Sequence, residues 1–280
     1  MSARESLPLC ERPIGVFDSG LGGLSALREI HARMPGETLI YFGDTGRVPY
    51  GTKSRQTIRT YAGQDMRFLA QMQPKAIVIA CGTVSSVALD ECSELFCGPV
   101  LGVIEPACRA ALAGGAERIG VLATQATVGS GAFLQTLQGL NAKAEVRQVA
   151  CPLFVPLVEN GFFGAEDPVP QLVAKRYLGA MEEWRPDAVI LGCTHYPHLR
   201  PAIEAALPGV PLIDTGAEVA KALQKTLAAA GLETTKKTGE MQFYVSDAPQ
   251  SFAQAANVFL GQTIEAVRRV TLVGQELRAV

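Results

Sequence analysis

The sequence lacks the features that mark a nucleic-acid-binding or membrane-bound protein. Its 280 residues carry 25 Lys and Arg against 27 Asp and Glu, so there is no basic excess to attract a polyanion. No uninterrupted apolar run is long enough to span a bilayer, and the opening MSARESLPLCERP contains no apolar core of a signal peptide. We therefore expect a cytoplasmic protein with a small-molecule ligand, no nucleic-acid partner and no membrane association.

Patterns typical of metal, disulfide and dinucleotide sites are also missing. The chain has seven cysteines and three histidines, and no two cysteines form a CxxC pair. Cys193 and His195 could supply two metal ligands, but no second ligand pair accompanies them. The glycine-rich stretch DSGLGG at 18–23 has neither the GxGxxG spacing nor the later acidic residue of a dinucleotide site. We expect free thiols, no metal and no cofactor.

Short apolar runs alternate with longer amphipathic segments along the chain, which indicates an α/β fold with mostly parallel sheets flanked by helices. In such folds the ligand site lies at the carboxyl ends of the strands. The tail after residue 232 starts polar and ends in a predicted strand and helix, and we expect it to fold back onto the first half of the chain. The predicted strands are 14–17, 38–42, 76–80, 99–103, 119–123, 144–149, 188–192 and 210–213. The predicted helices are 24–34, 54–72, 126–140, 170–184 and 217–231.

One local pattern occurs twice. IGVFDSG at 14–20 is similar to IGVLATQ at 119–125, and VIACGT at 78–83 is similar to ILGCTH at 190–195. This repeat predicts two similar halves that face each other across a cleft, each presenting one thiol. The alternative is coincidence, because all α/β units look alike at this level.

Cys81 and Cys193 are the strongest candidates for chemistry. Each follows a predicted strand and precedes Gly-Thr or Thr at a strand-to-helix turn. Backbone N–H groups at a helix N-terminus attract anions and lower the pKa of a thiol, so we expect reactive thiols here. For either cysteine alone, inert packing in the core is the common alternative.

Three further segments have the composition of a polar site. His195 lies two residues beyond Cys193, on the same side of an extended chain, where imidazole and thiol form an acid–base pair. Glu159 lies in the apolar stretch CPLFVPLVENG, and either a desolvated acid–base role or an exposed helix end fits it. Asp18 ends the first strand, where a plain turn or helix cap is the alternative. The loop GDTGRVPYG at 43–51 offers N–H groups for an anion, or is an ordinary connection.

Together these motifs resemble those of the glutamate racemase family, within the aspartate/glutamate racemase superfamily. The resemblance runs from Gly15 to about Gly261 and rests on GVFDSGLGGL, YFGDTGRVPYG, IACGT, CPLFVPLVENG, GCTHYP and LIDTG. It implies two similar α/β domains, residues 1–104 with 214–280 and residues 105–213, and an active site in the cleft between them. Members of the family often form homodimers, so the resemblance also implies that this chain can form one.

The implied activity is racemisation of glutamate without cofactor or metal. One cysteine thiolate removes the α-proton, and the other thiol returns a proton to the opposite face. The D-glutamate would enter peptidoglycan synthesis, and so cell-wall biogenesis and cell shape. By the resemblance Cys81 and Cys193 are the two bases, Asp18 supports Cys81, and His195 and Glu159 support Cys193. The residues implied in substrate binding are Asp18, Ser19, Pro49, Tyr50, Gly51, Gly82, Thr83, Thr124, Thr127 and Thr194.

Gly82 departs from the family, which usually has Asn after the first cysteine. Loss of that hydrogen-bond partner would cost about 1–2 kcal/mol of binding free energy if nothing replaces it. Three alternatives therefore stay open: a racemase of another amino acid such as aspartate, a non-catalytic glutamate-binding regulatory protein, and a cysteine hydrolase using Cys193 and His195. The last leaves Cys81 unexplained.

Overall fold

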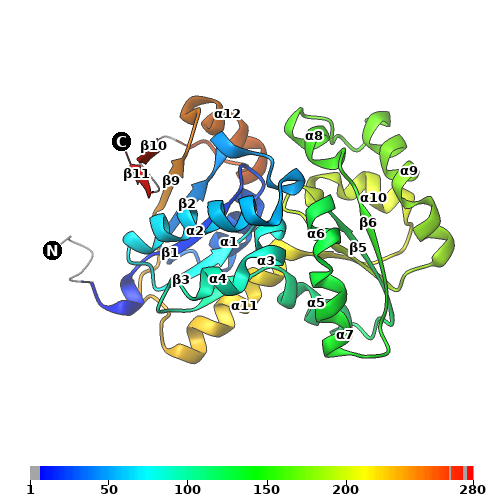
Figure 1. Ribbon diagram of the computed structural model, residues 1–280, viewed down its shortest axis with the longest axis horizontal. Helices are drawn as coiled ribbons and strands as arrows, with labels where there is room; N and C mark the ends of the chain where they lie inside the picture. Colours follow the sequence, from blue (N-terminus) through cyan, green and yellow to red (C-terminus); the bar gives the residue numbers. More distant parts are fainter. Residues whose placement is uncertain (1–6, 265, 274–275, 280) are drawn as a thin grey trace.

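The computed structural model describes residues 7–264, 266–273 and 276–279. Figure 1 shows two groups of strands and helices side by side, each built around its own sheet. We call the part built on the seven-stranded sheet the first lobe and the part built on the four-stranded sheet the second lobe. This arrangement confirms the predicted α/β fold with two similar halves, each a mostly parallel sheet flanked by helices.

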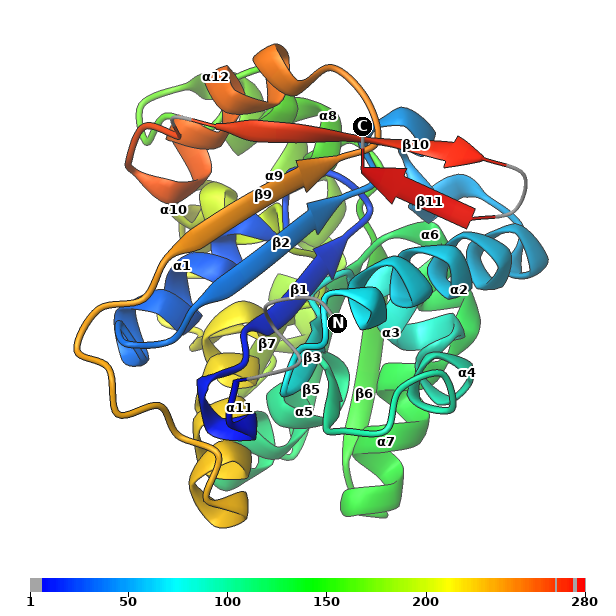
Figure 2. The same ribbon diagram turned by 90° about the vertical axis from the view of Figure 1, so that its left-hand side faces the viewer.

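The sheet of the first lobe has the strand order β11-β10-β9-β2-β1-β3-β4, and Figure 2 views it with β9, β2 and β1 side by side. All neighbours in it are parallel except the pair β10 and β11. The tail folds back onto this lobe as predicted, because β9 pairs with β2. Its strands are β1 (Ile14–Asp18), β2 (Leu39–Gly43), β3 (Ala76–Ile79), β4 (Val100–Gly102), β9 (Met241–Val245), β10 (Val267–Val273) and β11 (Glu276–Ala279).

The second lobe has the strand order β6-β5-β7-β8, and all its pairs are parallel. Every residue of β7, as of β1, β2 and β3, is buried, which explains why these strands are apolar throughout instead of alternating. The strands are β5 (Arg118–Ala123), β6 (Glu145–Ala150), β7 (Ala188–Leu191) and β8 (Leu212–Asp214).

Helices cover both faces of the sheets. In the first lobe, Phe17, Ile40 and Ile77 point toward α2, whereas their neighbours Val16 and Leu39 join the cluster that includes α1. That second cluster continues through α5 and α11 into the second lobe, so the two lobes share one core. The helices are α1 (Leu24–Arg33), α2 (Arg55–Gln71), α3 (Gly82–Val87), α4 (Leu89–Ser93), α5 (Ile104–Ala113), α6 (Gln125–Ser130), α7 (Ala132–Leu140), α8 (Phe154–Glu159), α9 (Pro168–Trp184), α10 (Arg200–Ala206), α11 (Thr215–Ala230) and α12 (Pro249–Leu260).

The expected elements are present, with one correction to a helix. The predicted helix 126–140 is two helices, α6 and α7, because Gly131 between them adopts φ 72°, a left-handed conformation that ends a helix. The short helices α3, α4, α5, α8 and α10 and the pairing of β10 with β11 were not predicted. Within the described residues, no helix combines the length and apolar character needed to cross a membrane.

Candidate active site

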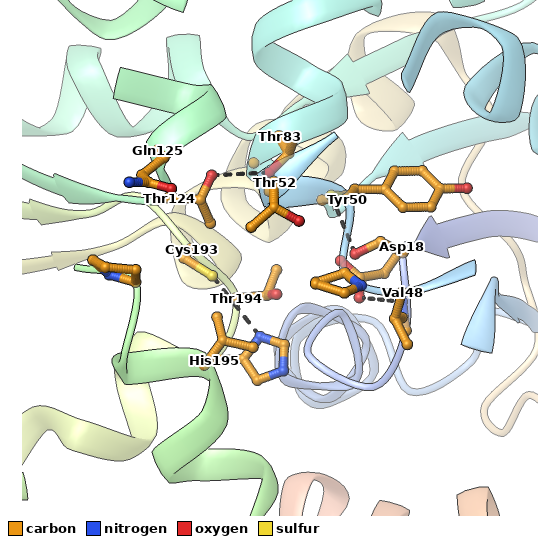
Figure 3. A pocket seen from close by; sticks show the side chains of 18 of the residues that line it. Asp18, Val48, Tyr50, Thr52, Thr83, Thr124, Gln125, Cys193, Thr194 and His195 are labelled. Carbon is orange, nitrogen blue, oxygen red and sulfur yellow. Dashed lines mark hydrogen bonds between the residues drawn. The ribbon is translucent and has the colours of Figure 1, made fainter. Parts of the chain in front are cut away.

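A cavity of about 220 Å³ opens between the carboxyl ends of β1 and β3 in the first lobe and those of β5 and β7 in the second. All of the predicted site residues except Thr127 line it. Figure 3 shows Cys193, Thr194 and His195 near one another, with Asp18 on the side of the first lobe and the ring of Tyr50 pointing away from them. The topology explains this convergence, since parallel strands bring residues that are distant in the sequence to one edge.

Cys81 is buried at the end of β3 and caps the first turn of α3. Its Sγ lies 3.6 Å from the hydroxyl of Ser19 and donates to it. Burial and the negative charge of Asp18 raise the pKa of Cys81 to about 12, although a backbone hydrogen bond from Val84 acts the other way. The expectation of a lowered thiol pKa is therefore wrong for Cys81, because desolvation outweighs the helix N-terminus.

Cys193 follows β7 and heads a chain of hydrogen-bonded side chains. Its Sγ lies 3.8 Å from Nδ1 of His195, and Nε2 of His195 lies 3.0 Å from a carboxylate oxygen of Glu159. Burial lowers the pKa of His195, but the hydrogen bonds to Cys193 and Glu159 outweigh it and raise the pKa to about 10. The imidazole is thus positively charged at neutral pH and stabilises negative charge on the Cys193 sulfur.

Asp18 presents a buried carboxyl group that lacks a full set of partners. Its Oδ2 accepts from the N–H of Gly20 at 2.9 Å, whereas Oδ1 has no hydrogen-bond partner among the residues that the structure describes. Burial raises the pKa of Asp18, against the opposing charge of His195 and the backbone N–H groups. A buried acceptor of this kind is suited to a cationic ligand group such as an ammonium.

The loop that follows β2 forms another wall of the cavity through Val48, Pro49, Gly51 and Thr52. Tyr50 also lines the cavity, but its hydroxyl lies outside it in a buried network with Asp44 and Asp65. Residues 45–47 and 50–52 form short 3₁₀ turns, so the loop is more regular than its sequence predicts.

Threonines join the two lobes across the cavity. The hydroxyls of Thr83 and Thr124 lie 3.1 Å apart, one from each lobe (Figure 3). Thr124 donates its hydroxyl to Thr127 at 3.0 Å, and Thr127 returns a backbone N–H at 3.3 Å. Thr127 is fully buried behind Thr124, so the structure gives it contact with Thr124 and none with the cavity. The carbonyl of Thr194 accepts from Ser25 at 3.0 Å.

Gly82 is one of the points where the two lobes approach each other closely beside the cysteines. A Cβ built on Gly82 would lie 2.4 Å from the carbonyl oxygen of Gly192, a distance that no side chain tolerates. Gly82 therefore does more than omit the side-chain amide of the family's Asn. It also permits the close contact between the two lobes.

The sequence interpretation missed several residues of the cavity wall. Gln125 follows Thr124, and Cys151, Pro152, Val155 and Pro156 precede Glu159. The motif CPLFVP that carries four of them was the available signal, although only its glutamate was singled out. Burial and the neighbouring Cys193 raise the pKa of Cys151 well above its ordinary value, so this thiol stays protonated. Over the described ranges, no group of three or more His, Cys, Asp or Glu side chains could hold a metal ion.

Two thiols from two similar α/β lobes meet in one cavity, Cys81 near Asp18 and Cys193 near His195. The model of the Asp/Glu/Hydantoin racemase family matches residues 15–223, and the chain belongs to this family.

Known members of the family cover nearly the whole chain. A glutamate racemase of Thermus thermophilus is 46% identical over 262 residues, 93% of this chain and 96% of the relative. The glutamate racemase of Chlorobaculum tepidum is 43% identical over 264 residues, again 93% and 96% of the two chains. The crystal structure of glutamate racemase from Francisella tularensis in complex with D-glutamate matches with a TM-score of 0.88 and 39% identity, covering 94% of this chain and 98% of that chain. The chain is an amino-acid racemase by this kinship.

Proposed function

We propose that the protein interconverts L- and D-glutamate by two-base proton transfer between Cys81, Cys193 and the α-carbon, without a cofactor. The observation that carries the proposal is the presence of one buried thiol from each lobe in a single cavity, in contrasting surroundings. The likeness to a glutamate racemase in complex with D-glutamate supports the choice of substrate.

The chemistry requires two groups. A single base tends to return the α-proton to the face from which it came, whereas racemisation needs delivery to the opposite face. The α-proton of an amino acid is weakly acidic, so the site must stabilise a developing carbanion. A buried, preorganised electrostatic environment provides that stabilisation.

The two thiols have different charged neighbours, and the reaction needs one cysteine as a thiolate and the other as a thiol. Burial and Asp18 raise the pKa of Cys81 and favour its thiol form, whereas Sγ of Cys193 lies 3.8 Å from Nδ1 of the His195 imidazole. In one direction the Cys193 thiolate takes the α-proton and becomes a thiol, and the Cys81 thiol donates a proton to the other face and becomes a thiolate. The opposite enantiomer runs the same steps backward.

The remaining residues orient the substrate in this proposal. The free oxygen of Asp18, with Ser19, receives the ammonium group, and this positive charge offsets the negative charge that disfavours a Cys81 thiolate. The backbone N–H groups of Tyr50 and Gly51, which follow Pro49 in the cavity wall, hold the side-chain carboxylate. The threonines beside the cysteines and Gly82 surround the α-carboxylate: Thr83, Thr124 and Thr194, with Thr127 supporting Thr124.

We also propose the setting of this activity. Residues 1–104 and 214–280 form the first domain, and residues 105–213 form the second. The enzyme acts in the cytoplasm, as a homodimer without a nucleic-acid partner, and supplies D-glutamate for peptidoglycan and hence for cell-wall biogenesis and cell shape.

The test is incubation of the purified protein with L-glutamate and, separately, D-glutamate in D₂O, following α-proton loss and optical rotation. Exchange and racemisation from both enantiomers are expected, with loss of both in Cys81→Ala and in Cys193→Ala. Aspartate, one methylene shorter, serves as the comparison substrate and should not span the loop and the α-carboxylate site. Glutamate binding without exchange would replace the proposal with a regulatory role, and faster turnover of aspartate would replace the substrate.

A further inference from the structure

A buried tyrosine hydroxyl lies between two buried carboxyl groups behind the cavity wall. The hydroxyl of Tyr50 donates to Oδ2 of Asp44 and lies 3.0 Å from Oδ2 of Asp65. Both carboxyl groups are fully buried, and the tyrosine is 1% exposed. Asp65 comes from α2, Asp44 from the end of β2, and Tyr50 from the loop that lines the cavity.

The donors around these carboxyl groups do not suffice for two ionised groups. Asp44 accepts from Nε of Arg47 at 2.6 Å, from the hydroxyl of Ser246 at 2.7 Å and from Tyr50. Asp65 accepts from Nη2 of Arg47 at 2.9 Å through Oδ1, but among the described residues only Tyr50 lies within hydrogen-bond distance of its Oδ2. The hydroxyl of Tyr50 lies within hydrogen-bond distance of both carboxyl groups, but its single proton can be donated to only one of them. With that proton donated to Asp44, the tyrosine oxygen and Oδ2 of Asp65 would face each other at 3.0 Å with no proton between them.

One additional proton resolves this arrangement, and its place follows from the partners. Besides the shared tyrosine, Arg47 and Ser246 donate to the two oxygens of Asp44, whereas Oδ2 of Asp65 has no other donor among the described residues. A proton on that oxygen donates to Tyr50, which donates to Asp44. The charges then balance as well, since Asp44 and Arg47 form one ion pair in the buried network.

The electrostatic surroundings of Asp65 act in the same direction. Burial and the charge of Asp44 raise the pKa of Asp65 well above its ordinary value, and Asp18 on β1 raises it further. Arg47 and the hydrogen bond with Tyr50 oppose the shift without cancelling it. Cys92 on α4 is another titratable neighbour, and burial and the charge of Asp65 raise its pKa to about 12, so it stays neutral. The ring of Tyr61 packs against both Arg47 and Tyr50.

The network is continuous with the cavity. Tyr50 is flanked by Pro49 and Gly51, which line the cavity, and the same loop is tied to the end of β9 because Gly46 donates its N–H to Ser246 at 2.8 Å. Tyr50 cannot move in its buried position without moving this wall.

We propose that Asp65 holds a proton at neutral pH and, by donating it to Tyr50, acts as a positioning residue for the Val48–Thr52 wall that holds the substrate. Its kinetic consequence rests on the function proposed above, whereas the proton itself does not. Asp65 touches neither substrate nor the cysteines and acts only through the tyrosine.

The test compares replacements that differ in a single donor. In Asp65→Asn the amide N–H takes the place of the carboxyl proton and the amide oxygen still accepts from Arg47, so KM for L-glutamate should stay within about threefold of wild type. Asp65→Leu has similar volume but no donor, and KM should rise about tenfold with a smaller change in kcat. Asp44→Asn is the matched control for the Asp-to-Asn change itself. Asp44 accepts from Arg47, Ser246 and Tyr50, so an amide N–H there would face donors and KM should rise.

Infrared spectroscopy measures the proton directly and does not depend on catalysis. The wild-type spectrum should contain a protonated carboxyl band that shifts in D₂O, disappears in Asp65→Asn and moves in Tyr50→Phe. If that band is absent from wild type, or persists in Asp65→Asn, the proposal is wrong. It is also wrong if Asp65→Asn raises KM as much as Asp65→Leu, or if Asp65→Leu leaves KM unchanged. Lack of racemisation by wild type would overturn only the proposed function, because the infrared result stands alone.

Discussion

The α-carbon of Gly82 faces the carbonyl oxygen of Gly192, one from each lobe, and a Cβ on Gly82 would lie only 2.4 Å from that oxygen. This contact lies directly beside Cys81 and Cys193 in the sequence. Together with the contact of Gly22 with Thr194 and His195, it leaves no room for a side chain between the lobes at this point.

We therefore expect Gly82→Ala, and still more Gly82→Asn, to lower activity, even though the family usually has Asn at this position. Either side chain forces the lobes apart, at a cost of about 1–3 kcal/mol in the free energy of unfolding. Steady-state kinetics and denaturant unfolding measure both effects. Gly139→Ala is the matched control, because a Cβ on Gly139 has no atom within 4 Å. Full activity in Gly82→Asn would show that the lobes adjust freely.

Asp18→Asn should lower the pKa of Cys81, since the negative charge of Asp18 is one of the causes that raise it to about 12. At a given alkaline pH the thiolate fraction of Cys81 then increases, and its alkylation becomes faster. The same variant should raise KM, because the ammonium group loses a charged partner. Mass spectrometry of Cys81 alkylation as a function of pH, in a Cys193→Ala background, separates the two effects. An unchanged alkylation profile would contradict the assigned influence of Asp18.

Glu159→Gln should move the alkaline limit of activity to lower pH. Glu159 is among the causes that raise the pKa of His195 to about 10, so without its charge the imidazole loses its proton earlier. The measurement is the pH profile of kcat/KM, which for an equilibrium constant of one must change equally for both enantiomers. A profile identical to that of wild type would show that Glu159 does not raise the pKa of His195.

The same histidine makes stability depend on pH. Because the pKa of His195 is raised in the folded protein from 6.5 to about 10, its stabilising contribution is complete below pH 6.5 and is lost as pH rises through about 10. The difference in unfolding free energy between wild type and Glu159→Gln should therefore shrink over this window. Denaturant unfolding at several pH values measures it, and a difference that grows with pH would have the wrong sign.

Thr127→Val should raise KM by about three- to tenfold while leaving kcat less affected, because Thr124 loses one hydrogen-bond partner worth about 0.5–1.5 kcal/mol. Thr127 keeps its backbone N–H to Thr124, so the helix cap remains. Thr60→Val, at an exposed position on α2, is the control for the loss of a threonine hydroxyl. Equal effects of the two variants would exclude a specific role for Thr127.

The strands and the residues at their ends were predictable because both signals are local. An apolar run followed by Cys81-Gly-Thr or Cys193-Thr-His is visible within a few residues. Parallel strands then bring their carboxyl ends, and these residues, to one edge of the sheet. The raised pKa of Cys81 was not predictable, because it depends on burial and on Asp18, which only the fold brings near. The orientation of the Tyr50 hydroxyl likewise depends on Asp65, on another element. Similarly, the conformation of Gly131 that separates α6 from α7 is not visible in an otherwise helical pattern.

The order of the strands also has a consequence for synthesis on the ribosome. The four strands of the second lobe, β5 to β8, are consecutive in the chain. The sheet of the first lobe is complete only after β9, which pairs with β2, has been synthesised. The second lobe can therefore complete its sheet while the earlier lobe is still missing an interior strand, which reverses the usual N-terminal-first order. Ser246, which holds Asp44 behind the cavity wall, emerges with that late strand. A nascent chain stopped before it would carry both cysteines and still lack a finished site.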